Sequence, residues 1–565
     1  MPCNRISHSA GTGLAFLVLA LSATAQTPPD AGSLMKQIEK GLPAPIPQPQ
    51  RPAVVLEPEM KPPTGLVVTV RRFRFVGNIH VDEARLQAAV AAWLNRPIDF
   101  VELQKAAAAA AALYRDAGWV VRAYLPQQEI DGGEVTIRIV EAVFGSVKIE
   151  AAQGIRVSQE SVRARVLKAQ KPGEVLHTEA IDRSLLILED TPGVRVRGHL
   201  TEGQNDGETD LVLQLDPQPL LAGDAGVDNT GSHSTGANRL TANLYANSPL
   251  RWGDLATGNA IHTQGSDYLR AAWSAPLGSD GLRAGVSQSY LEYRVVTSEF
   301  STLGLKGHSA TTGLDLSYPL IRSTSRNLYL SLNQNFKSFY NLASGASTSD
   351  YSVNVASAGL SGNRFDNLAG GGVLAGSVVL SAGRVDLSGS ANQHADAITV
   401  QTQGGFQKLQ YSLSRRQVIN PDLSLNAMLS GQMASKNLDS GDKFFLGGAA
   451  GVRAYPSNEA GGSDGNLINI ELSYNLPGNY ALTGFYDWGK VTVNHHNDFA
   501  GAANPNQQSL QGAGLSLAVP SAAGVTCRLT WAHRIGSNPN PTNSGNDQDG
   551  TRVLNRFWVQ ASMSF

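Results

Sequence analysis

From residue 218 to residue 565 the chain alternates apolar and polar positions over short segments. In segment 239–247 the odd positions are mostly polar, and the even positions are Leu240, Ala242, Leu244 and Ala246. Segment 557–565 has the same period, and its odd positions are Phe557, Val559, Ala561, Met563 and Phe565. A period of two predicts β-strands with two different faces. A transmembrane β-barrel needs such strands, because one face meets lipid and the other a wet lumen, but a soluble β-sandwich alternates too.

Turn residues divide this region into strands. Prolines follow strand-like segments at Pro249, Pro276, Pro319, Pro421, Pro477 and Pro520, and we predict connections there because proline cannot continue a central strand. Longer polar loops are predicted at Asn341–Tyr351, Asn494–Leu510 and Gly536–Thr551. Tight turns thus alternate with long loops, as in bacterial outer-membrane barrels. About 350 residues, at about 22 per strand and connection, predict roughly sixteen antiparallel strands.

Residues 66–217 follow a different pattern, in which the order strand, helix, helix, strand, strand occurs twice. In the first copy, 66–142, a strand passes through Phe73 and Phe75, and Asp99 with Glu102 resembles a capping box. The second copy, 143–217, has predicted elements at Val147–Ile149, Ser158–Ala169, Thr178–Leu188, Val194–Leu200 and Leu211–Leu215. Two copies favour a tandem repeat of small α+β domains, and one unrelated α+β domain is the alternative.

The first 64 residues are predicted to be a leader and a tether. Arg5, the apolar run 14–21 and the small residues Ala23 and Ala25 are typical of a secretory signal peptide, residues 1–25. Residues 26–64 predict a short helix, capped by Ser33 and ended by Gly41, and then a proline-dense linker. Alternatives are an uncleaved anchor and a leader without a role. No later apolar run is long enough for a helical membrane span, so an exported chain of this kind is either soluble or a barrel.

Composition narrows the function classes. Charged residues make up 16% of the chain and the formal net charge is −2, which gives no electrostatic reason to expect nucleic-acid binding. Of the 2 cysteines, Cys3 lies in the predicted signal peptide, so the mature chain has Cys527 alone and forms no internal disulfide. A structural thiolate zinc site is therefore not expected.

Two segments contain residue types that are used in catalysis or metal binding. The segment His495-His496-Asn497-Asp498 contains metal-ligand types, but it lies in a predicted external loop. The letters of Gly461–Gly465 match a G-x-S-x-G nucleophile elbow, yet a polar loop precedes them and a strand-like segment follows, instead of the strand and helix that the elbow needs. We therefore expect no catalytic residue, no metal, no cofactor and no enzymatic activity.

Several short motifs together resemble one family. They are Arg72–Asn78, Gly226–Gly231, Asn247–Leu250, Gly451–Tyr455 and Gly484–Gly489. Through these motifs the chain resembles the outer-membrane transporters of bacterial two-partner secretion. These transporters are the haemolysin secretion/activation type and belong to the barrel-assembly superfamily. The resemblance implies two periplasmic POTRA domains, 66–142 and 143–217, before a sixteen-stranded outer-membrane barrel, 218–565. It also implies a partner, a large secreted β-helical exoprotein of the adhesin or haemolysin type.

The same resemblance suggests the candidate site. Val452, Arg453, Ala454 and Tyr455 are similar to the family's motif on a long sixth external loop, which folds back into the lumen. Phe485, Asp487 and Gly489 are similar to a paired motif on a barrel strand, and the family implies that Arg453 pairs with Asp487. Ala454 stands where the family usually has glycine, so it carries strain if that backbone needs a positive φ. We expect water in the lumen to make removal of one partner of this pair less costly than removal from a dry buried pair.

Three alternatives stay open at this point: an outer-membrane insertase of the same superfamily, a passive porin and a barrel hydrolase. A porin does not account for the two domains before the barrel, and insertases more often have longer POTRA arrays. Two hypotheses follow for the transporter. An edge strand such as Val194–Leu200 captures the partner, and the helix at Ser33–Gly41 plugs the barrel.

Overall fold

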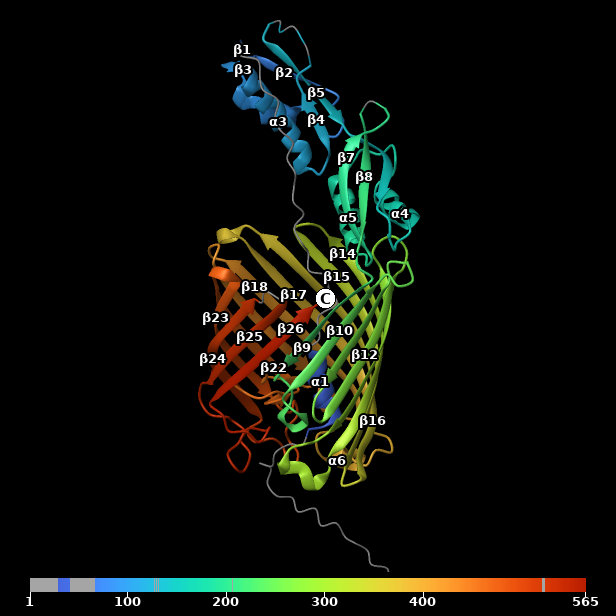
Figure 1. Ribbon diagram of the computed structural model, residues 1–565. Coiled ribbons are helices and arrows are strands. Elements are labelled where there is room, and N and C mark those ends of the chain that lie inside the picture. Colours follow the sequence, from blue (N-terminus) through green and yellow to red (C-terminus); the bar gives the residue numbers. More distant parts are fainter. Residues whose placement is uncertain are drawn as a thin grey trace, which may run out of the picture.

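The computed structural model describes residues 29–40, 67–126, 128, 130, 132–205, 207–520 and 524–565. The predicted signal peptide, 1–25, and most of the predicted linker lie outside these residues. The described chain forms helix α1 (Ala31–Lys40), two small α+β units and a closed β-barrel, and α1 lies inside the barrel (Figure 1). Among the helices of the described segments, none is long and apolar enough to cross a bilayer.

The first α+β unit has a three-stranded sheet with the order β2-β5-β4. Its elements are β1 (Val67–Thr69), β2 (Arg72–Val76), α2 (Glu83–Val90), η1 (Ala91–Trp93), β3 (Pro97–Asp99), α3 (Phe100–Asp116), β4 (Val121–Tyr124) and β5 (Glu134–Glu141). Asp99 caps α3, because its Oδ1 accepts a hydrogen bond of 2.8 Å from the Glu102 backbone N–H. Phe73, Tyr114 and Ile137 are fully buried between helix and sheet.

The second unit repeats this topology with the sheet order β6-β8-β7. Its elements are β6 (Val143–Ala151), α4 (Gln159–Ala169), α5 (Thr178–Glu189), β7 (Val194–Glu202) and β8 (Glu208–Pro217). In both three-stranded sheets the last strand in the chain (β5 or β8) is central; it is parallel to the first strand (β2 or β6) and antiparallel to the second (β4 or β7). The predicted tandem repeat is therefore confirmed. In this arrangement β7 is an edge strand.

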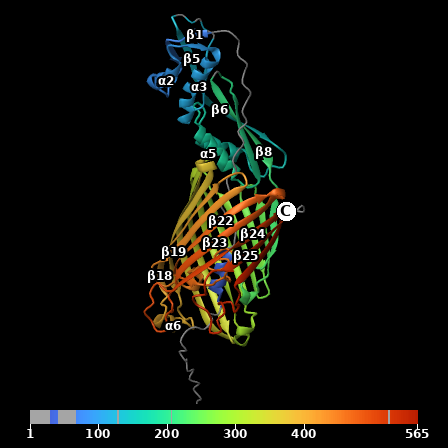
Figure 2. The same ribbon diagram turned by 90° about the vertical axis from the view of Figure 1, so that its left-hand side faces the viewer.

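Specific contacts hold the second unit to one end of the barrel, where both views place it (Figures 1 and 2). Arg322 of the barrel donates to both carboxylate oxygens of Asp190, at 2.8 and 2.7 Å. Arg156 donates to the Ser248 carbonyl, and Arg183 donates to the Pro319 carbonyl. Arg183 also donates to Asp280 Oδ1 at 3.4 Å, so the second unit contacts the turns after β10 and β12 and the end of β14.

The barrel is closed by sixteen antiparallel strands, and its last strand pairs with its first. They are β9 (Leu221–Asp228), β10 (Arg239–Asn247), β11 (Leu255–His262), β12 (Ser266–Pro276), β13 (Arg283–Arg294), β14 (Lys306–Arg322), β15 (Arg326–Ala343), β16 (Ala346–Asp366), β17 (Gly372–Asp386), β18 (Gly404–Val418), β19 (Leu423–Ala434), β22 (Asp464–Leu476), β23 (Tyr480–Thr492), β24 (Gln507–Pro520), β25 (Val525–Arg534) and β26 (Asn555–Ser564). Leu240 and Leu244 are exposed on the outer face, whereas Asn243 donates to Asp224 on the inner face. The predicted strand number and the predicted alternation are confirmed.

Two expectations about the connections are wrong. Residues 341–351 are not a loop, because β15 and β16 continue to a tight turn at Ser344 and Gly345, both with positive φ. In this segment Ser349 and Tyr351 are buried while the polar residues between and beside them are exposed. This alternation is typical of a strand, even though most of the residues are polar. Pro319 lies within β14 and not after it, at a register shift between Pro319 and Ile321 that accommodates a residue without an N–H.

Candidate functional site

A long loop between β19 and β22, residues 435–463, folds into the barrel; we call it the inward loop. It contains η5 (Ser440–Asp442) and the short paired strands β20 (Phe444–Phe445) and β21 (Gly461–Gly462). Its apolar side chains pack on the inner wall of strands β22 to β25. The buried members of this cluster are Leu446, Val452, Ala454, Tyr455, Ala460, Leu467, Phe485, Val491, Leu510 and Ala532.

Arg453 joins the inward loop to the barrel wall. Its Nε donates to Asp487 Oδ2 at 2.9 Å and its Nη2 donates to Oδ1 at 2.6 Å. The Arg453 backbone N–H also donates to Asp487 Oδ2, at 3.0 Å. Nη1 donates to Glu471 Oε1 at 2.7 Å, and the guanidinium lies 3.5 Å from the centre of the Phe485 ring. The two residues that the resemblance pairs are therefore in bidentate contact, the geometry that planar guanidinium and carboxylate groups favour.

The Arg453–Asp487 pair is more deeply buried than the sequence suggested. Asp487 has no exposed surface and Arg453 is 9% exposed. Burial lowers the pKa of the Arg453 guanidinium, but Asp487 and Glu471 outweigh burial and raise it overall. The expectation that lumenal water bathes the pair is therefore wrong, since the packed loop excludes solvent from it.

Two further residues hold the same site, and the motifs did not include them. Asn469 Nδ2 donates to Asp487 Oδ1 at 2.7 Å and to the Gly451 carbonyl at 3.1 Å. Trp558 Nε1, on the last strand, donates to the Arg453 carbonyl at 2.8 Å. The sequence does single out Trp558, because it is the one aromatic residue among the polar residues on the inner face of segment 557–565. The site thus connects β22, β23 and β26 through one loop.

Glycines on the wall make room for the loop. The backbone of Ala454 does not have a positive φ, so the expected strain at this departure from the family motif is absent. A Cβ on Gly512 would lie 2.6 Å from the Ala454 Cβ, and a Cβ on Gly489 would lie 2.6 Å from Leu446 Cδ2. The alanine therefore fits because residue 512 has no side chain.

The tip of the inward loop contacts the last external loop, residues 535–554. The Arg534 guanidinium lies 4.3 Å from the Tyr455 ring centre and pairs with Asp547. Glu459 accepts hydrogen bonds from Asn538 Nδ2 at 2.7 Å and from the Gln548 backbone N–H at 2.9 Å. Burial, together with nearby Asp547, raises the pKa of Glu459 to about 7.

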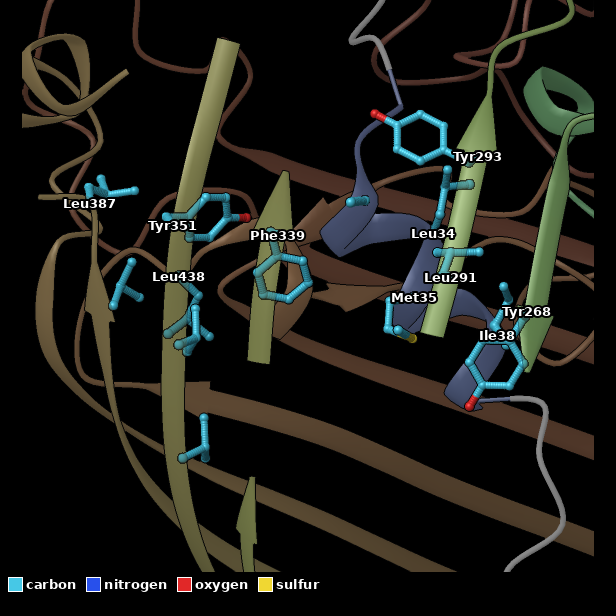
Figure 3. Close-up of a cluster of buried hydrophobic side chains, with 14 of the residues drawn as sticks. Leu34, Met35, Ile38, Tyr268, Leu291, Tyr293, Phe339, Tyr351, Leu387 and Leu438 are labelled. Carbon is cyan, nitrogen blue, oxygen red and sulfur yellow. The ribbon is translucent and has the colours of Figure 1, made fainter. Parts of the chain in front are cut away.

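Helix α1 occupies the lumen beside this loop (Figure 3). Its apolar side chains Leu34, Met35 and Ile38 are buried, and Figure 3 shows Leu34 beside Leu291 and Ile38 beside Tyr268 of the wall. The full cluster consists of Ala31, Leu34, Met35, Ile38, Ile261, Tyr268, Leu291, Tyr293, Phe339, Tyr351, Val353, Val355, Val385, Leu387, Phe406 and Leu438.

Polar contacts bind both ends of α1. The Ser33 backbone N–H donates to Asp30 Oδ1 at 2.7 Å, so Asp30 and not Ser33 caps the helix. Ser440 Oγ of the inward loop donates to the same oxygen at 3.0 Å. At the other end Asn458 Nδ2 donates to Gln37 Oε1 at 3.2 Å, and Lys40 Nζ donates to the carbonyl of Phe445 at 3.3 Å. The helix and the inward loop thus form one connected structure in the lumen.

The histidine and serine residues whose types suit metal binding or catalysis have ordinary structural partners. His495 pairs with Asp464 at 2.9 Å, and the described residues contain no group of three potential ligands close enough to hold a metal. Ser463 is fully buried, accepts from the Leu438 N–H, and is followed directly by strand β22. It therefore lacks the geometry of a nucleophile elbow.

Comparisons with known proteins agree on one family. A model of the haemolysin secretion/activation protein family ShlB/FhaC/HecB matches residues 207–519, and a model of the ShlB-type POTRA domain matches residues 68–142. The heme/hemopexin transporter protein HuxB of Haemophilus influenzae is 25% identical over 574 residues, which cover 97% of each chain. The outer membrane transporter CdiB of Dickeya dadantii is 23% identical over 479 residues, with 83% of this chain and 81% of that protein covered.

Solved structures show the same fold. CdiB from Escherichia coli superposes with a TM-score of 0.68 at 20% identity, covering 91% of this chain and 94% of the other. CdiB from Acinetobacter baumannii gives a TM-score of 0.63 at 18% identity, covering 94% and 96%. At these identities the structures support the architecture alone.

Proposed function

Because the chain belongs to the haemolysin secretion/activation protein family (ShlB/FhaC/HecB), the outer-membrane transporters of two-partner secretion, we propose that it exports a large β-helical exoprotein of the adhesin or haemolysin type. The barrel lies in the bacterial outer membrane and the POTRA domains lie in the periplasm. The observation that supports an export channel, and not an open pore, is the lumen itself, which holds a seated helix and an anchored inward loop. The test is secretion, by cells that make this chain, of an exoprotein encoded beside it.

We propose that β7 captures the partner. Among the described residues this strand lies at the edge of its sheet and pairs with β8, and Leu200 on it is 39% exposed. A free strand edge offers backbone donors and acceptors to an extended segment of the partner. Deleting residues 66–216 should abolish secretion, while heat-modifiable gel mobility still shows an inserted barrel. Normal secretion by this deletion would contradict capture by the POTRA domains.

We propose that α1 closes the pore at rest. Sixteen strands enclose room for a channel, and the helix fills part of it through its buried face. Removal of residues 26–60 should raise single-channel conductance in planar bilayers. An unchanged conductance would count against a plug.

Family members are transporters, and we propose that this chain has no catalytic activity of its own. The buried and fully partnered state of Ser463 supports this view. The test is an assay of the purified barrel on phospholipid and peptide esters, in which turnover that is lost in Ser463→Ala would contradict the proposal.

A further inference from the structure

Three segments of the chain meet at the extracellular end of the barrel. They are the tip of the inward loop, the first external loop (residues 229–238) and the last external loop (residues 535–554). Figure 1 shows the last external loop, in red, at the end of the barrel opposite the POTRA domains. Ser457 Oγ of the tip donates to the Thr230 carbonyl of the first external loop at 3.2 Å. The three segments therefore meet beside β26 and β9, the strands that close the barrel.

Glu459, at the tip, is a buried carboxylate whose hydrogen-bond donors are neutral. It is 1% exposed. Its Oε1 accepts a hydrogen bond from Asn538 Nδ2 at 2.7 Å, and its Oε2 accepts one from the Gln548 backbone N–H at 2.9 Å. In the part of the chain that the structure describes, none of the ion pairs includes Glu459. A charge on this carboxylate is therefore costly, because burial removes its water and no cation takes the place of that water.

A second carboxylate shares the site with Glu459. The same Asn538 Nδ2 also donates to Asp547 Oδ1 at 2.7 Å, so one amide nitrogen bridges the two carboxylates. Asp547 is 1% exposed and pairs with Arg534, whose guanidinium also lies over the Tyr455 ring. When two carboxylates lie this close, the charge of one opposes the ionisation of the other. A proton in this site therefore belongs to Glu459, the member of the pair without a cation.

The charged groups on the surrounding elements leave this balance in place. Arg556 of β26 lies 3.8 Å from Asp547 and 3.6 Å from Asp549. His233 of the first external loop contacts the backbone carbonyl of Asp549 through Nδ1, at 2.8 Å. The two guanidinium groups, those of Arg534 and Arg556, thus face three buried carboxylates.

The pKa of Glu459 agrees with this geometry. Burial raises it to about 7, and the charges of Asp547 and Asp549 act in the same direction. The hydrogen bonds from Asn538 and Gln548 lower the pKa but do not cancel the rise.

We propose that Glu459 is a proton-operated latch, which holds the inward loop to the last external loop while it carries a proton and releases the loop when it is charged. A released tip is in water, where the pKa of a glutamate is about 4.3. Between about pH 4.3 and about pH 7 the held tip therefore keeps a proton that the released tip has lost, and each unit of rising pH favours release by about tenfold. At higher pH both states are charged and this effect ends. The latch lies among the external loops, so the pH outside the cell operates it.

The test measures ion leak through the full-length chain in planar bilayers, without any exoprotein. Wild-type openings should become up to about tenfold more frequent for each unit by which pH rises from about 5 to about 6.5. Glu459→Gln keeps the size of the side chain but cannot become charged, so its openings should stay rare over this range. The matched control is Asp498→Asn, which makes the same kind of change at an exposed carboxylate in the loop between β23 and β24, and it should keep the wild-type profile.

A second variant tests the carboxylate pair. Asp547→Asn removes the charge beside Glu459 and leaves Arg534 to act on it, so the rise in opening frequency should end at lower pH; a rise that ends at the wild-type pH would overturn the pairing. A flat wild-type profile would overturn the latch, and so would a rise with pH, or frequent openings at about pH 5, in Glu459→Gln. Heat-modifiable gel mobility checks that each barrel is assembled. Because no cargo is present, the result is independent of the proposed secretion function.

Discussion

Replacing Arg453 with alanine tests whether the inward loop must be held for transport. The change removes two hydrogen bonds to Asp487, one to Glu471 and the contact with the Phe485 ring. Asp487 keeps the backbone N–H of residue 453 and the amide of Asn469, but loses its counter-charge in a site without exposed surface. Removing one partner of a buried pair costs about 3–5 kcal/mol, and the dry packing of this pair argues for the full range.

Such a cost changes the equilibrium between held and released loop by about 10²- to 10⁴-fold. Arg453 lies outside the sixteen barrel strands and takes no part in the hydrogen bonds between them, so the barrel should still assemble. We expect strongly reduced secretion with normal heat-modifiable gel mobility. Arg453→Lys should rescue poorly, because an ammonium group keeps the charge but loses the planar fork.

The assay compares secretion by Arg453→Ala, Asp487→Ala and the double variant. Because both residues serve one contact, the double loss should be smaller than the sum of the single losses. A matched control is Arg415→Ala, which removes another bidentate arginine–aspartate pair, with Asp366, outside the inward loop and with about a quarter of each side chain exposed. Because water reaches this pair and neither residue contacts the inward loop, that variant should secrete normally. Strictly additive losses, or intact secretion in either single variant, would refute the role of the pair.

Three further predictions concern close contacts and charge in the lumen. Gly512→Ala should reduce secretion, because the new Cβ would lie 2.6 Å from the Ala454 Cβ. Adding Ala454→Gly should restore secretion, and a double variant that still secretes poorly would show that this contact is not the cause. Gly32→Val should raise single-channel conductance by forcing α1 away from Gly441, with Gly32→Ala intermediate, and an unchanged conductance would contradict the close fit. The lowered pKa of Lys36, about 7 in the seated helix, means that seating strengthens as pH rises through 7, so wild-type conductance should fall between pH 6.5 and 9, and should change less in Lys36→Met.

The barrel could be predicted from sequence because the membrane imposes a period of two on every strand, as Leu240 and Leu244 show. The loop predicted at 341–351 was wrong for a physical reason: its serines suit a loop locally, but the segment is the tip of the β15–β16 hairpin, in which Asn341 pairs with Ser349 and Leu342 pairs with Ser347. The position of α1 had no local signal, since an amphipathic helix does not indicate which wall it contacts. The Arg453–Asp487 contact came from family resemblance and not from periodicity, and Asn469 was missed because a lone asparagine on a strand looks like any lumenal residue.

The contacts between α1 and the inward loop have a thermodynamic consequence. Gln37 touches Asn458, Asp30 touches Ser440 and Lys40 touches the Phe445 carbonyl, so each element forms part of the binding surface of the other. Coupling of this kind is reciprocal: the free energy by which the held loop favours helix binding equals the free energy by which the bound helix favours the held loop, so release of the loop weakens helix binding by this shared amount. A lesion in the loop should therefore appear first as a leak of small ions, measurable without any exoprotein present.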